Sequence, residues 1–231
     1  MPVTDDGCMT VITSPELVRT RDAWHRVAEH VLAAGQFAAA GTIRLRAFPG
    51  GFATVVGVHG RQLAVDGDRL VLIDGAVRRE TPLTSVGDAA AFAGVTPGLR
   101  GTYTPATAAD PGALLEVDPG AARSFADWYA LTDAALRRFC SGLGVVQEPV
   151  LWPEHLDVAV AVDAVNYGGS LGDDTVPEPY LYVGPHGGPP SDDPFWNAPF
   201  GAAVTIDRIT TPDQAVDFFE QGRALIDRSG T

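Results

Sequence analysis

The sequence predicts an α+β fold with a mostly antiparallel sheet of about six to eight strands and three main helices, in one domain over residues 1–231. Three observations predict it: three helical stripes of apolar residues, two groups of short alternating strands, and tight turns within each group. Consecutive strands joined by PGG, HG and DGD turns favour hairpins, and hence antiparallel pairing. Because helices and strand groups alternate, halves of 14–140 and 141–231 are possible.

Each main helix is predicted to begin with a capping side chain followed by proline at the first helical position. In each helix the apolar residues recur at helical spacing and should face a core. A shorter helix is expected from Ser85 to Ala93. The main helices are expected to run from Ser14-Pro15 to about Gly35, from Asp118-Pro119 to about Cys140, and from Thr211-Pro212 to about Arg228.

The predicted strands combine alternation with β-branched and aromatic residues, and Gly- and Pro-rich segments bound them. Two long loops are expected, at 94–113 and at 184–194, because both consist largely of turn-forming residues. The strands are expected at 42–48, 52–59, 61–65 and 69–74 between the first two helices, and at 156–162, 179–184 and 201–206 after the second.

Composition excludes several function classes. The chain is 45% hydrophobic, which is enough to bury a core, yet it has no apolar run long enough to span a membrane. Asp5 and Asp6 stand where a signal peptide would carry positive charge, so we expect a cytoplasmic protein with free thiols at Cys8 and Cys140. All 16 basic residues are arginines. Without lysine, neither a pyridoxal phosphate Schiff base nor a P-loop nucleotide site can form.

The net charge of −13 is unevenly distributed. Residues 1–140 carry 13 arginines and 15 acids, whereas residues 141–231 carry 3 arginines and 14 acids, giving net charges of −2 and −11. An acidic surface repels phosphate backbones, so nucleic-acid binding and membrane association are not expected. The acidic half could attract a cationic ligand or a basic protein partner, or could simply keep the protein in solution.

The segment LWPEHLD places imidazole and carboxylates where a strand begins. His155, with Glu154 or Asp157, is the candidate titratable pair for acid–base chemistry, since a histidine near a carboxylate is a plausible general base at neutral pH. A metal held by His155 and Asp157 is an alternative. The structural alternative is that His155 only bonds the backbone of a proline-containing turn.

Aromatic and amide side chains between 152 and 200 do not follow a helical stripe. Apolar walls with a few hydrogen-bonding groups are typical of a pocket for a polar ligand, although the same residues could pack a core. The pocket is predicted from segments 152–182 and 195–200. Its candidate ligand-binding residues are Trp152, Asn166, Tyr167, Asp173, Asp174, Tyr180, Tyr182, Trp196 and Asn197.

Two further motifs are interpreted as structural. Gly168-Gly169-Ser170-Leu171-Gly172 matches the G-x-S-x-G nucleophile elbow, but the prolines that follow disfavour the helix that this elbow requires. A glycine-rich turn is expected there instead. At 100° per residue, His25 and Glu29 lie on one flank of the first helix and His30 on the other, which predicts a solvent-exposed face.

Several phrases of the sequence resemble a family of uncharacterised actinobacterial proteins, and the resemblance is densest in 151–202. It implies a cytoplasmic bacterial protein and assigns no catalytic residue. The phrases are GTIRLRAFPGGFAT (41–54), LWPEHLDVAV (151–160), VNYGGSLGDD (165–174), PEPYLYVGP (177–185) and FWNAPFGA (195–202).

The function predicted from these features is binding of a small polar or cationic ligand, with or without acid–base chemistry, in an aromatic- and carboxylate-lined pocket. The alternative is an interaction module whose acidic C-terminal half docks a basic protein. The first requires the acids around a concave cavity. The second requires them on a flat or convex face beside an exposed apolar patch.

Overall fold

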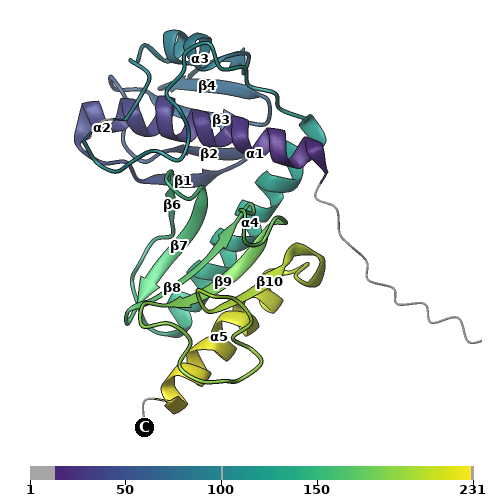
Figure 1. Cartoon of the computed structure of the whole chain (residues 1–231). Coiled ribbons are helices and arrows are strands. Elements are labelled where there is room, and N and C mark those ends of the chain that lie inside the picture. The colour runs from purple at the N-terminus through teal and green to yellow at the C-terminus, as the bar shows by residue number, and fades with distance from the viewer. Residues whose placement is uncertain (1–13, 100, 230–231) are drawn as a thin grey trace, which may run out of the picture.

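The computed structural model describes residues 14–99 and 101–229 (Figure 1). Within these residues the fold is α+β, as predicted, and one antiparallel sheet contains ten strands, more than the six to eight expected. The helices are α1 (Pro15–Val27), η1 (Ala28–Ala33), α2 (Ala34–Ala40), α3 (Val86–Ala93), α4 (Pro119–Gly142), η2 (Ile206–Arg208) and α5 (Pro212–Ser229). The strands are β1 (Leu45–Phe48), β2 (Gly51–Thr54), β3 (Gln62–Asp66), β4 (Arg69–Asp74), β5 (Val77–Pro82), β6 (Val150–Trp152), β7 (Asp157–Val162), β8 (Val165–Ser170), β9 (Tyr180–Pro185) and β10 (Ala202–Thr205).

The predicted caps begin the three main helices. The side chains of Ser14 and Asp118 accept backbone N–H groups of the first turns of α1 and α4, at 3.3 and 2.8 Å. Thr211 and Gln214 form the reciprocal pair of a capping box at the start of α5. The first helix continues past the predicted end at Gly35, because its middle turn, η1, is π-helical and leads directly into α2.

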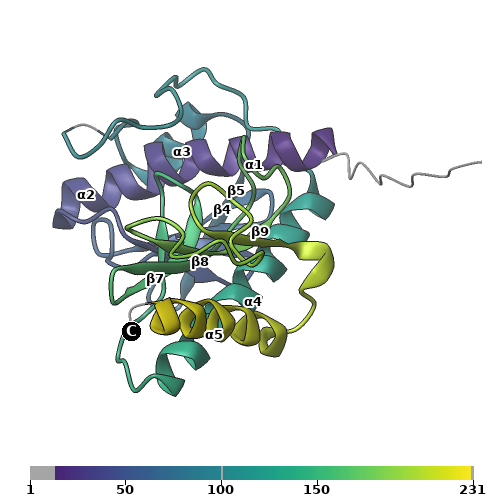
Figure 2. The same ribbon diagram turned by 60° about the horizontal axis from the view of Figure 1, so that its bottom comes forward.

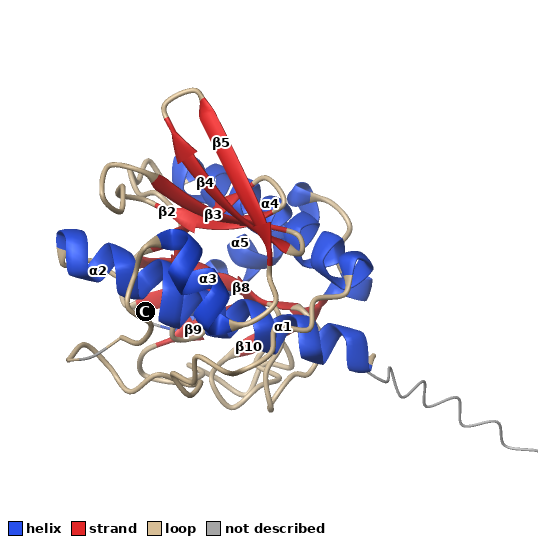
Figure 3. Cartoon of the chain, turned by 90° about the horizontal axis from the view of Figure 1, so that it is seen from above, coloured by secondary structure: helices blue, strands red, loops and turns tan. Residues whose placement is uncertain are grey.

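The strand order is β10-β9-β8-β7-β6-β1-β2-β3-β4-β5. Each half of the sheet is a five-strand meander that follows a long helix and precedes another helix. The halves join where β1 pairs with β6, through Leu45 and Leu151. The second helix–meander–helix unit begins with α4. In Figure 3, β2–β5 lie at an angle to β8–β10, as expected for a large twisted sheet.

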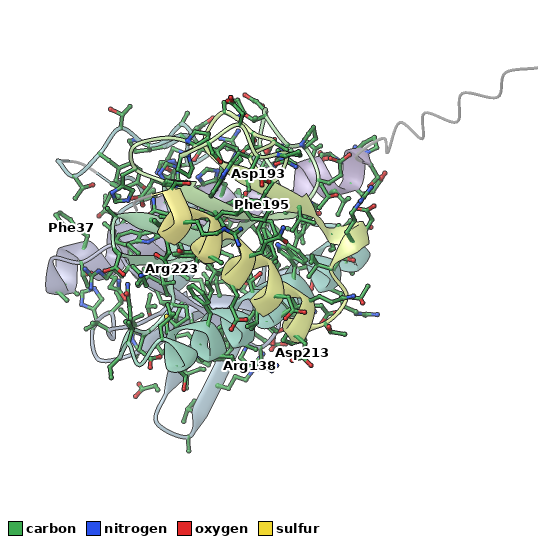
Figure 4. All side chains as sticks on the ribbon, turned by 90° about the horizontal axis from the view of Figure 1, so that it is seen from below. Phe37, Arg138, Asp193, Phe195, Asp213 and Arg223 are labelled. Atoms are coloured by element: carbon green, nitrogen blue, oxygen red, sulfur yellow. The ribbon has the colours of Figure 1, made fainter. Side chains whose placement is uncertain are left out.

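One face of the sheet carries the core. Trp24 of α1 packs against Phe52 of β2 and against Phe125 and Tyr129 of α4, with ring centroids 5.5 to 6.3 Å apart. Cys140 of α4 is a buried free thiol, whereas Cys8 lies outside the described residues. The helices α4 and α5 lie side by side under the second half-sheet, linked by an ion pair between Arg138 and Asp213 (Figure 4).

β5, β6 and β8 were not predicted from the sequence. β5 is an exposed edge strand that reads VRRETP, so it lacks the alternation of a half-buried strand. β8 contains Gly168 and Gly169, which were expected in a turn. Both lie in the strand, where glycine leaves room for neighbours that approach the backbone closely. A Cβ on Gly169 would lie 2.6 Å from Thr132 Oγ1 of α4. The glycine turn begins only at Gly172, whose φ is 102°.

Candidate functional site

A cavity of about 1030 Å³ lies on the face of β7–β9 that points away from the core. In Figure 2, α4 and α5 lie on one side of these strands and α1 on the other. The cavity wall therefore combines the strand face with the flank of α1. The β6–β7 turn, the loop around Thr107, and the segments around His186 and Phe200 complete it.

Strand alternation determines which side chains reach this cavity. Asp157, Ser170 and Tyr180 are register partners across β7, β8 and β9, so they share one face. The next row on that face pairs Gly168 with Tyr182. A Cβ on Gly168 would lie 2.6 Å from Tyr182 Oη, so the glycine lets the phenol lie flat across β8 towards Asp157.

Asp157 is the central titratable group of the cavity. Its side chain is buried, with the residue 6% exposed, and Oδ2 accepts a hydrogen bond from Tyr182 Oη. Oδ1 is buried without a hydrogen-bond partner among the described residues. Burial raises the pKa of Asp157 from an ordinary 3.8 to about 6; Glu154 adds to the rise, while Tyr182 and His155 oppose it. The carboxyl group therefore exchanges its proton close to neutral pH.

His25 faces the same cavity from α1. Nε2 of the imidazole forms no hydrogen bond within the described part of the chain and lies 3.8 Å from Glu29 Oε1. Burial lowers the pKa of His25, against the opposing effects of Glu29 and of the Pro153 backbone.

The expectation of a solvent-exposed face at Glu29 and His30 was wrong, because both side chains are fully buried. Glu29 accepts hydrogen bonds from the backbone N–H groups of Ala106 and Thr107, at 2.8 and 2.9 Å, and from the hydroxyls of Thr107 and Tyr103, at 2.6 and 3.2 Å. His30 Nε2 lies 2.9 Å from the Thr107 carbonyl. These contacts fasten the loop that follows α3 over the cavity.

The loop that covers this face explains the error. Residues 103–107 pack over Glu29 and His30 and form hydrogen bonds with both side chains. Their carboxyl and imidazole groups approach to 3.8 Å. Residues 28–33 are π-helical, with i→i+5 hydrogen bonding. A π-helical turn inside a long helix is frequent at functional sites, but nothing in the local sequence signals one here.

Eight of the predicted site residues line the cavity. Asp173 accepts from Thr175 N, Val176 N and Tyr180 Oη, and Asn166 Oδ1 lies 3.1 Å from His186 Nε2. The predicted residues on the wall are Glu154, His155, Asp157, Asn166, Asp173, Asp174, Tyr180 and Tyr182.

Four predicted ligand-binding residues lie outside the cavity. Tyr167 alternates to the core face of β8 and packs on Phe139, 4.6 Å between centroids. Trp152 stacks under the guanidinium of Arg44, and Trp196 packs edge-on against its neighbour Phe195. The Asn197 amide is engaged in a pair of hydrogen bonds with the Ala203 backbone. None of these four lines the cavity.

The cavity also contains residues that sequence reasoning missed. They come from distant segments, and no local pattern marks them as part of one site. Strand alternation could have indicated Ser170 once β8 was recognised as a strand. The missed residues with polar side chains are Arg21, Asp22, His25, Arg26, Thr107, Ser170 and His186.

Two alternative chemistries find little support in the geometry. Residues 14–99 and 101–229 contain no group of three or more His, Cys, Asp or Glu side chains that could hold a metal ion, so His155 and Asp157 lack a third protein ligand. No helix follows Ser170, whose Oγ accepts from Gly172 N at 3.1 Å within a turn. The nucleophile elbow is therefore not formed.

Replacing Gly168 with alanine is expected to lower the free energy of unfolding by about 1–3 kcal/mol, the usual range for overpacking. The new methyl group would lie 2.6 Å from Tyr182 Oη and 2.7 Å from the Val158 carbonyl, so the phenol must move away from Asp157. Urea denaturation measures the loss. Gly142→Ala is the control, because its Cβ would have no neighbour within 4 Å. Equal stability of the two variants would contradict the role assigned to Gly168.

No protein-family model, curated protein or solved structure matches this sequence. The resemblance to the actinobacterial family therefore stays a prediction. Among the helices that the structure describes, none has the length and apolar character needed to cross a membrane.

Proposed function

We propose that this protein binds a small polar ligand in the cavity over β7–β9 and that Asp157, His25 and His155 act on it as acid–base groups. One observation carries the proposal: Asp157 Oδ1 is buried and unpartnered on the cavity wall. A buried polar atom without a partner costs about 1–3 kcal/mol. A ligand that donates the missing hydrogen bond to Oδ1 would offset this cost, which explains why the protein keeps a buried carboxylate there.

The neighbouring groups support the same interpretation. His25 Nε2 and Glu154 Oε2 are likewise buried and unpartnered, and both residues line the cavity. His155 interacts electrostatically with both Asp157 and His25, so it lies within range of each. A carboxyl group with a pKa of about 6 beside two imidazoles can exchange protons at neutral pH.

The geometry favours this function over the interaction module. Four acids of the strongly acidic half, Glu154, Asp157, Asp173 and Asp174, line the concave wall. Within the described part of residues 141–231, the large exposed hydrophobic side chains are Leu143 and Val146, in the α4–β6 connection. Four of the fourteen acids of residues 141–231 therefore line a concave cavity, as the binding of a ligand requires.

Native mass spectrometry of the protein purified from the organism that encodes it, without dialysis, tests the proposal. We expect a small-molecule adduct on the wild-type chain and at least tenfold less adduct on Asp157→Asn, because removing a charge-assisted hydrogen bond costs roughly 1.5–3 kcal/mol. Asp217→Asn, at an exposed position on α5, is the matched control and should keep the adduct. Absence of an adduct, together with no binder in an NMR screen of small polar molecules, would refute the proposed function.

A further inference from the structure

We infer that the cavity recognises a protonated amine that still carries N–H groups, held between Asp157 Oδ1, Glu154 Oε2 and the aromatic rings of β9 and Phe200. This inference rests on the proposed function and names the chemical class of the ligand.

The unpartnered carboxylate oxygens of the cavity require donors. Asp157 Oδ1 accepts when the group is ionised, and Glu154 Oε2 does the same. A primary ammonium group supplies three N–H donors, whereas a hydroxyl supplies one and a quaternary ammonium none.

Three aromatic rings line the same cavity. Tyr180, Tyr182 and Phe200 have mutual centroid distances of 6.0 to 6.4 Å. Tyr180 donates its hydroxyl to Asp173, and Tyr182 donates to Asp157. With the hydroxyls engaged, the rings offer π faces, which attract organic cations.

The charge balance of the wall favours a cation. Five acidic side chains line the cavity, against the two guanidiniums of Arg21 and Arg26. Arg21 already donates to the Pro177 carbonyl at 3.4 Å and lies 3.9 Å from Asp22. The five acids are Asp22, Glu154, Asp157, Asp173 and Asp174.

The test uses three probes with one skeleton: 2-phenylethylamine, its N,N,N-trimethyl analogue and 2-phenylethanol. Affinities are measured by NMR titration at pH 7.5, with the side-chain nitrogen signals of His25 reporting the site. We expect the amine to bind about tenfold more tightly than the alcohol, and more tightly than the trimethyl analogue, because only the amine combines charge with N–H donors. Asp157→Asn should reduce the amine affinity about tenfold and leave the alcohol unchanged.

Two further measurements keep the inference open to refutation. Phe200→Leu removes a ring without touching Asp157 and should weaken both cations about threefold. Amine affinity should rise between pH 5 and pH 7.5 as Asp157 ionises. The groups facing Asp157 are His25 of α1, Glu154 and His155 of the turn, Ser170 of β8, and Tyr180 and Tyr182 of β9.

The failures of the two proposals are distinguishable. An alcohol that binds as tightly as the amine, or an amine affinity unchanged in Asp157→Asn, overturns the amine inference but leaves a small-molecule site. If none of the probes binds and no native adduct is found, both the amine inference and the proposed function fall.

Discussion

Replacing Glu29 with alanine is expected to release residues 103–107 from η1 and to lower the free energy of unfolding by about 3 kcal/mol or more. Its fully buried carboxylate accepts four hydrogen bonds, two of them from backbone N–H groups. Alanine would leave those donors without their partner. Because the loop lines the cavity, ligand binding should fall together with stability.

Urea denaturation measures the stability change, and hydrogen exchange at the Ala106 and Thr107 amides measures the release of the loop. Glu16→Ala is the control: it removes the same side chain from the exposed start of α1, where Glu16 forms an exposed ion pair with Arg19 at 3.2 Å, and should change stability far less. If Ala106 and Thr107 remained protected in Glu29→Ala, the carboxylate would not be what holds the loop.

Asp157→Asn is expected to be more stable than the wild-type chain at pH 7, by about 3 kcal/mol, although it should lose the ligand. The folded-state pKa of Asp157 is about 6, above its ordinary value of 3.8, so the folded protein binds the proton more tightly than the unfolded chain does. That stabilisation is fully present below pH 3.8 and is lost as the pH rises through 6. Asparagine has the same shape, keeps an acceptor for Tyr182 and does not ionise.

The measurement is the difference in unfolding free energy between the two proteins from pH 3.5 to pH 7.5. The difference should move in favour of the variant across pH 4 to 6 and then level off. Carboxylates that do not interact with Asp157 titrate equally in both proteins and cancel. A difference that stays flat over this range would show that Asp157 is not desolvated as the structure indicates.

Local signals predicted the helices and most strands. Each proline-preceded cap begins a helix, because the capping bonds involve only neighbouring residues. β8 was missed because its glycines leave room for the side chains of Thr132 and Tyr182, which are distant in sequence. Composition alone cannot distinguish a glycine in a turn from a glycine under a tyrosine.

The site was predicted only in part, for the same reason. The β6–β7 turn and β9 supplied Glu154, His155 and the two tyrosines from one short region of the chain. His25 reaches them from α1, about 130 residues away, through a fold that no single segment encodes. Tyr167 could not be assigned to the core or to the pocket from the sequence. Neighbouring residues of a strand point to opposite faces, so its position depends on the exact register of β8.

The seam between β1 and β6 has a consequence for how such a chain could arise and diverge. On each side of this antiparallel seam the five strands follow one another in chain order, β1 to β5 on one side and β6 to β10 on the other. Two copies of one half would form the same arrangement as a twofold dimer. When both halves belong to one polypeptide, each can change independently. The sheet faces opposite the main core differ between the halves. In the first half this face carries the paired row Ala53, Ala64 and Val71, which are buried and have no reactive group. In the second half it carries Asp157, Tyr180 and Tyr182. Duplication followed by specialisation would leave one half as scaffold and the other as the reactive partner.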